Sequence, residues 1–171
     1  MTNDNEIEDF GLLRRVQRFL FNEANLLDNW KVMDWMDLVT HDIDYRIPIR
    51  TTLENEQYSD QFNPAAFHMI EDFGSLNARM KRLDGGYAFS ESPRSRVRRH
   101  VTNICVLGRK ENDIEVTSNL LFFWARDDLE RLVSAERRDI LREIDGELRL
   151  ARRLVLLDHV SLPIPNLTVV L

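Results

Sequence analysis

His100 is a candidate for proton transfer, because an imidazole titrates near neutral pH. It lies in the stretch Arg98-Arg99-His100-Val101-Thr102-Asn103, inside an apolar segment that is typical of a strand. Together with Tyr45 or Asp42 on a neighbouring strand, it could act as a general base in a cavity. The alternative is a histidine that only forms hydrogen bonds at the surface of a sheet or subunit.

Arginine is concentrated in two parts of the sequence. The first is a cluster around Ser95 and Val97, which could bind an anion or the carboxylates of a partner; a solvated strand end is the simpler alternative. The second, residues 126–153, holds eight arginines and eight acidic residues, which indicates ion pairs between neighbouring strands or across an interface. The candidate interface residues are Arg94, Arg96, Arg98, Arg99, Arg152 and Arg153.

The sequence lacks the motifs that common cofactors require. Cys105 is the only cysteine, so a thiolate-bound iron–sulfur cluster and a cysteine-type zinc site are both excluded. No two of the four histidines are spaced i, i+4, which leaves open only a metal site assembled from distant histidines. The six glycines form no phosphate-binding loop, and the Gly-x-Ser-x-Gly motif is missing. We therefore expect no metal or other cofactor in this chain.

Composition narrows the class of protein further. The 171 residues carry a formal net charge of −6, which is the wrong sign for a chain that mainly binds nucleic acid. The longest apolar run is Leu120–Ala125, far short of the roughly 20 residues of a membrane span. The first nine residues are polar and acidic, unlike a secretory signal, so we expect a cytoplasmic protein with no membrane partner.

The elements that would position these residues begin with helices. Apolar residues recur at steps of three and four over residues 8–28, and a second, shorter helical pattern covers 30–39. Residues 43–50 alternate between apolar and polar types, as a strand with one buried face does. A loop is expected over 51–64, and then a third helix over 68–83 that Gly85-Gly86 ends.

The second half of the chain predicts long strands. These are expected at 97–107, 114–125, 129–141 and 148–160, with a hairpin at Asp145-Gly146 and a tail at 161–171. In the third strand, Leu132 and Ser134 share a face with Glu136 and Arg138. In the fourth, one face carries Arg152 and four leucines, Leu148, Leu150, Leu154 and Leu156. Helices followed by a curved antiparallel sheet that covers them predict one α+β domain over 1–171.

Six sequence segments, in this order and spacing, resemble the small (beta) subunit of bacterial aromatic-ring-hydroxylating dioxygenases. They are Glu23-Ala24-x-Leu26-Leu27-Asp28, Arg79-Met80-Lys81-Arg82-Leu83, residues 88–103, Val116-Thr117-Ser118-Asn119, residues 151–158 and Asn166-Leu167. The match spans nearly the whole chain. The ending Thr168-Val169-Val170-Leu171 departs from the aromatic ending of many family members, so the docking of the tail is expected to differ in detail.

The resemblance implies a cone-like fold of the nuclear-transport-factor and cystatin-like type. It also implies a hexamer of three large and three small subunits, in which copies of this chain form a trimer. The large (alpha) subunit would hold the Rieske two-iron two-sulfur cluster and the mononuclear non-haem iron, and the complex would dihydroxylate an aromatic compound. The family supplies no catalytic residue for the small subunit, and none is assigned here.

Two hypotheses of different class follow. In the first, the chain is a structural subunit that holds the large subunits in register. In the second, it is a stand-alone, metal-free isomerase or dehydratase on the same fold, with His100, Tyr45 and Asp42 around an apolar cavity. A cone filled with its own side chains favours the first, and an open pocket where the three groups converge favours the second. A module that binds nucleic acid is disfavoured by the acidic composition.

Overall fold

The computed structural model describes residues 4–51, 61–85, 94–162, 164 and 170–171, with no side-chain description for residues 4–9. Three helices and one six-stranded sheet make up this part of the chain. The helices are α1 (Asp4–Asp28), α2 (Val32–Met36) and α3 (Phe73–Asp84). The strands are β1 (Val39–Arg50), β2 (Phe62–Glu71), β3 (Arg96–Lys110), β4 (Asp113–Arg126), β5 (Leu129–Ile144) and β6 (Glu147–Leu157).

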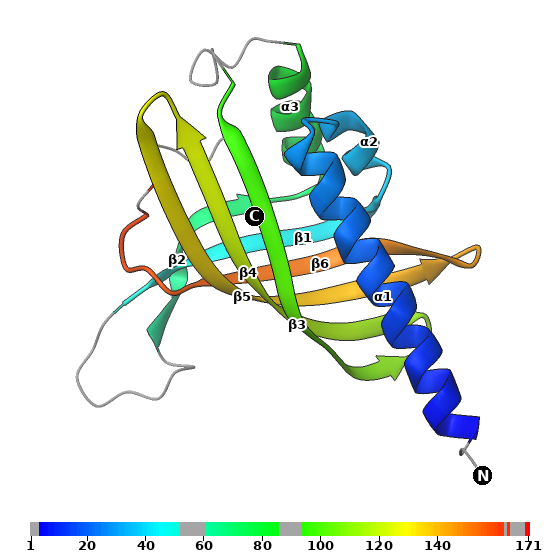
Figure 1. The fold of residues 1–171 in the computed structure, drawn as a ribbon. Helices are drawn as coiled ribbons and strands as arrows, with labels where there is room; N and C mark the ends of the chain where they lie inside the picture. The colour runs from blue at the N-terminus through cyan, green and yellow to red at the C-terminus, as the bar shows by residue number, and fades with distance from the viewer. Residues whose placement is uncertain (1–3, 52–60, 86–93, 163, 165–169) are drawn as a thin grey trace.

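The sheet has the strand order β2-β1-β6-β5-β4-β3 and bends strongly, with the helices on one side (Figure 1). The predicted α+β class and the curved sheet are therefore confirmed. Its pairs are antiparallel except β1–β6, which is parallel. The predicted hairpin at Asp145-Gly146 joins β5 to β6, and both residues have positive φ, 51° and 82°, as a type I′ turn requires.

Two predicted elements between residues 51 and 83 were wrong in part. The segment Phe62–Glu71 is a strand, β2, where a loop and the start of a helix were expected; residues 52–60 of that loop lie outside the described residues. Helix α3 begins only at Phe73, because Asp72 caps it: the Ser75 amide donates to Asp72 Oδ1 at 2.8 Å, and the Ser75 hydroxyl accepts from the Asp72 amide. Its end at Asp84, with Gly85 as the cap, agrees with the prediction.

Alternation along the strands defines two faces of the sheet. The inner face, which the helices cover, carries Ile43, Tyr45 and Ile47 of β1 and most of the buried positions of β4 to β6. Helix α1 closes it with Val16, Leu20 and Leu27, at the predicted helical spacing. The outer face is the opposite one, and no described helix covers it.

Candidate functional site

The inner face carries a cluster of buried charges in addition to its apolar side chains. Arg153 of β6 donates two hydrogen bonds to Glu23 of α1, at 2.7 and 2.8 Å, and two to Asp139 of β5, at 2.9 and 2.8 Å. Exposure of these three side chains is 1% or less. The Trp35 indole also donates to Glu23, at 3.1 Å. This cluster ties the first helix to two central strands.

Arg137 of β5 is the second buried cation of the cluster. Its Nη1 lies 3.5 Å from Glu23 Oε2, and its Nε donates to the Ser118 hydroxyl at 3.3 Å. Burial and the neighbouring charge of Arg153 lower the pKa of Arg137, and nearby carboxylates oppose that shift.

The ionisation of the cluster follows from these contacts. Burial raises the pKa of Glu23, but the charges of Arg153 and Arg137 outweigh it, so the pKa falls below its usual range. Burial also disfavours the charged form of Arg153, yet the carboxylates of Asp139 and Glu23 raise its pKa well above the ordinary value. Glu23 and Arg153 are therefore ionised at neutral pH, and neither exchanges a proton readily there.

The end of the sequence lies against this cluster. Tyr45 Oη donates to the Leu171 carbonyl at 2.8 Å and accepts from the Leu171 amide at 2.9 Å. Arg99 donates to the Val170 carbonyl at 2.6 Å and to Asp28 at 2.7 Å. Both Val170 and Leu171 are buried. Side chains and these two residues therefore occupy the space that a cone-shaped enzyme would use for its substrate.

The three residues proposed for the stand-alone enzyme do not meet. Tyr45 lies on the inner face, and burial raises its pKa. Asp42 and His100 are exposed on the outer face, and strands β6, β5 and β4 separate β1 from β3, so the two are not on neighbouring strands. Asp42 instead pairs with Arg142 at 2.7 Å. His100 lies opposite Leu121 of β4.

The six candidate interface arginines divide into two groups. Arg94, Arg96, Arg98 and Arg152 are exposed. Arg99 and Arg153 are buried at 6% and 0% exposure, so their assignment to an interface was wrong: their guanidinium groups bond to carboxylates and carbonyls of this same chain. The predicted ion pairs between neighbouring strands are confirmed by Arg153–Asp139 across β5 and β6 and by Arg142–Asp113 across β4 and β5.

The outer face carries exposed apolar side chains and arginines. Leu121 of β4 is 40% exposed, on the strand that pairs with β3 and its exposed Arg96 and Arg98. Leu132 is 50% exposed on β5, one strand farther from β3. A hollow of about 250 Å³ opens on the same face farther along the sheet. It is lined by Arg46, Pro48, Phe62, Asn63, Pro64, Phe67, Arg138, Arg152, Leu154 and Leu156. Apolar centres edged by arginine are typical of protein interfaces.

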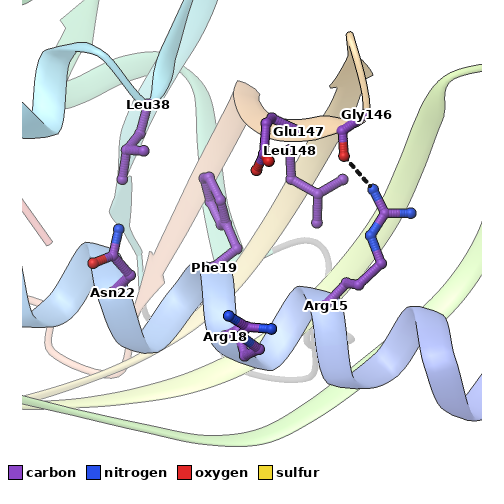
Figure 2. A pocket seen from close by; sticks show the side chains of 8 residues that line it. All are labelled: Arg15, Arg18, Phe19, Asn22, Leu38, Gly146, Glu147 and Leu148. Carbon is purple, nitrogen blue, oxygen red and sulfur yellow. Dashed lines mark hydrogen bonds between the residues drawn. The ribbon is translucent and has the colours of Figure 1, made fainter.

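A larger hollow, of about 450 Å³, lies between α1 and the β5–β6 turn (Figure 2). Arg15, Arg18, Phe19 and Asn22 line it from the helix, and Arg15 donates to the Gly146 carbonyl at 2.9 Å. Leu38 and residues 146–148 complete the wall. Among its described lining residues there is no histidine, cysteine or serine, and Glu147 supplies the carboxylate.

The described part of the chain offers no group of three His, Cys, Asp or Glu side chains that could ligate a metal ion. Within the same residues, no helix combines the length and the apolar character needed to span a bilayer.

A bent sheet closed on one side by its own helices, with apolar and arginine side chains on the outer face, defines the class of cone-like α+β folds. The chain belongs to the family of ring hydroxylating beta subunits, whose sequence model matches residues 22–163. The family resemblance stated from the sequence is thereby confirmed. Such beta subunits are parts of oxidoreductases that hydroxylate aromatic rings. The beta subunit itself is not catalytic.

Individual relatives agree with this assignment. The chain is 30% identical to the beta subunit of biphenyl 2,3-dioxygenase from Rhodococcus jostii (strain RHA1), over 94% of this chain and 89% of the relative. A solved structure of naphthalene 1,2-dioxygenase has a chain with a TM-score of 0.83 at 23% identity, covering 95% of this chain and 87% of that one. A putative scytalone dehydratase from Novosphingobium aromaticivorans DSM 12444 shares the fold with a TM-score of 0.64 at 19% identity, covering 93% and 89% of the two chains.

Proposed function

We propose that this chain supports assembly of the terminal oxygenase component of an aromatic-ring-hydroxylating dioxygenase. Its partner is the large subunit, which holds the Rieske cluster and the mononuclear iron, and three copies of each subunit form a hexamer. Biphenyl, in the name of one relative, illustrates the class of substrate. In this complex the chain has a structural role, and the large subunit performs the redox chemistry.

The closed interior is the observation that carries the proposal. Tyr45 is bonded to Leu171 inside the cone, while His100 and Asp42 lie on the opposite face of the sheet. A dehydratase on this fold would need its acid and base groups to converge on one substrate. The stand-alone enzyme is therefore the weaker hypothesis.

The outer face supplies the docking residues in this proposal. Arg96, Arg98 and Arg152 are exposed beside apolar side chains of the outer face, and Arg94 stacks on Trp30 at 5.3 Å near the start of β3. Guanidinium groups pair with carboxylates in two parallel hydrogen bonds, so the matching surface of the partner is acidic with an apolar centre.

The test is to purify the chain alone and together with its large subunit. We expect no oxygen uptake from the chain alone and substrate-dependent uptake from the complex. The double substitution R96E/R98E should reduce co-purification at least about tenfold, because it places like charges against an acidic surface. K81E, on an exposed position of α3, is the matched control and should leave co-purification unchanged.

A second variant separates the two hypotheses. H100A should leave the activity of the assembled complex unchanged, or lower it only in proportion to lost assembly. Turnover of an aromatic substrate by the isolated chain, abolished by H100A, would overturn the proposal in favour of the stand-alone enzyme.

A further inference from the structure

We propose that the inner face of the sheet is a peptide-binding site and that residues 170–171 are its resident ligand. The inference rests on contacts inside this chain and does not depend on the assembly role. Three polar side chains from three different strands converge on two consecutive residues: Tyr45 from β1, Arg99 from β3 and Arg153 from β6. All three are buried.

Each of three backbone groups of residues 170–171 forms a hydrogen bond with a side chain of the inner face. The Tyr45 hydroxyl satisfies both the amide and the carbonyl of Leu171, at 2.9 and 2.8 Å. Arg153 Nη1 lies 3.5 Å from the same carbonyl, at the limit of a hydrogen bond. Arg99 Nη2 donates to the preceding carbonyl, that of Val170, at 2.6 Å. Bonding of this kind selects an extended peptide unit, whatever its side chains are.

The receptor side is held in place by contacts that do not involve the segment. Asp28 accepts from the Arg99 guanidinium at 2.7 Å and from the Arg99 amide at 3.0 Å. The Arg99 guanidinium also lies over the Phe122 ring, with 4.9 Å between Cζ and the ring centroid. Arg153 is fixed by Glu23 and Asp139. The donors are therefore oriented before the peptide arrives, which reduces the entropy that binding must overcome.

The side chains define the chemical class of the ligand. Val170 is 1% exposed and Leu171 is 0% exposed, so the site surrounds two aliphatic side chains as well as their backbone. A ligand must therefore supply one amide and two carbonyl groups with aliphatic side chains, as N-acetyl-valyl-leucine amide does. Loss of the segment would leave Tyr45 and one donor of Arg99 buried without these partners, which favours a replacement of the same chemistry.

Hydrogen exchange on the full chain is the first test. We expect the Leu171 amide to be protected, and Y45F to accelerate its exchange at least about fivefold, because the ring stays but the hydroxyl is lost. Amides of β4 serve as the control for the whole fold. The proposal fails if the Leu171 amide exchanges like a free peptide, if Y45F changes nothing, or if β4 accelerates equally.

Replacement in trans is the second test. A chain that ends at Val169 should be stabilised in a saturable manner by N-acetyl-valyl-leucine amide, and not by N-acetyl-glycyl-glycine amide. Y45F in the shortened chain should weaken binding at least about fivefold. Equal response to both probes would overturn the proposal. If the shortened chain does not fold, hydrogen exchange in the full chain decides, with L171D as the displacing variant and V160D, at a 52% exposed position, as its control.

Discussion

Arg152 and Arg153 are neighbours in the sequence with opposite environments, and they give the sharpest test of the buried cluster. The Arg153 side chain is 0% exposed and makes four hydrogen bonds to two carboxylates. The Arg152 side chain is 56% exposed and only reaches Asp44, at 4.0 Å. The same substitution, arginine to methionine, removes the same charge at both positions and keeps a similar chain length.

The expected loss of stability differs severalfold between the two variants. R153M leaves Glu23 and Asp139 buried without their main counter-charge, a change that typically costs about 3–5 kcal/mol. R152M removes a solvent-screened pair and should stay within about 0.5 kcal/mol. At roughly 2–4 °C per kcal/mol for a chain of this size, R153M should lower the melting temperature by about 6–20 °C.

The assay is urea unfolding and thermal unfolding, both followed by circular dichroism, with both variants and the parent measured under the same conditions. A third variant, R153M/D139L, removes one of the stranded carboxylates and should recover part of the loss, because an apolar replacement of a whole pair is often tolerated. Equal destabilisation by R152M and R153M would refute the assignment of Arg153 to a structural cluster. The assignment would also be refuted if R153M/D139L were less stable than R153M by as much as a second, independent buried substitution costs.

Two further outcomes follow from single residues. Burial raises the pKa of Glu23, but Arg153 and Arg137 lower it more, so the folded pKa lies below the unfolded value of 4.5. The ionised Glu23 therefore contributes its full stabilisation above pH 4.5, and this contribution is lost as the pH falls through the folded pKa. E23Q should flatten the decrease in stability below pH 4.5, as measured by urea unfolding at a series of pH values. G146A should destabilise the fold by about 1 kcal/mol, because Gly146 has a φ of 82°. G11A should be neutral or stabilising, because Gly11 lies in α1 with open space around the added methyl group. A larger loss of melting temperature for G11A than for G146A would contradict this reasoning.

The sequence predicts the faces of β5 correctly and those of β6 only in part. Leu132 and Arg138 share the outer face of β5, as expected from strict alternation. In β6, Leu148 and Leu150 face inward while Leu154 and Leu156 share the outer hollow with Arg152. The register of β5 against β6 shifts between Ile140 and Leu141, and this irregularity reverses the alternation. A bulge of this kind leaves no clear mark in the sequence.

Strand β2 was missed because its own residues do not alternate. The stretch Phe62–Glu71 contains Pro64 and two alanines, which disfavour a strand. Pairing with β1 nevertheless forms it, through contacts such as Ile47 opposite Met69 and Tyr45 opposite Glu71. The strand is thus specified by its partner across the sheet, and local propensity could not reveal it.

The buried arginines were missed for a different reason, since a signal was present. Arg137 and Asp139 have the same parity as Val133, Ala135 and Leu141, so alternation alone places them on the inner face. The general rule that charged side chains lie outside led to the wrong interface assignment for Arg153. Only the presence of matching carboxylates on α1 and β5 makes the inward position possible, and that match is a property of the folded chain.

The ionisation of the interior explains why the cone of this chain is poorly suited to acid–base catalysis. Catalysis at neutral pH favours groups whose pKa lies near 7. The environment moves the pKa of Glu23 down and those of Tyr45 and Arg153 up, away from neutrality in each case. His100 lies on the outer face, away from these three groups. The interactions that stabilise the closed cone therefore move the pKa values of these three groups away from the range that proton transfer at neutral pH favours.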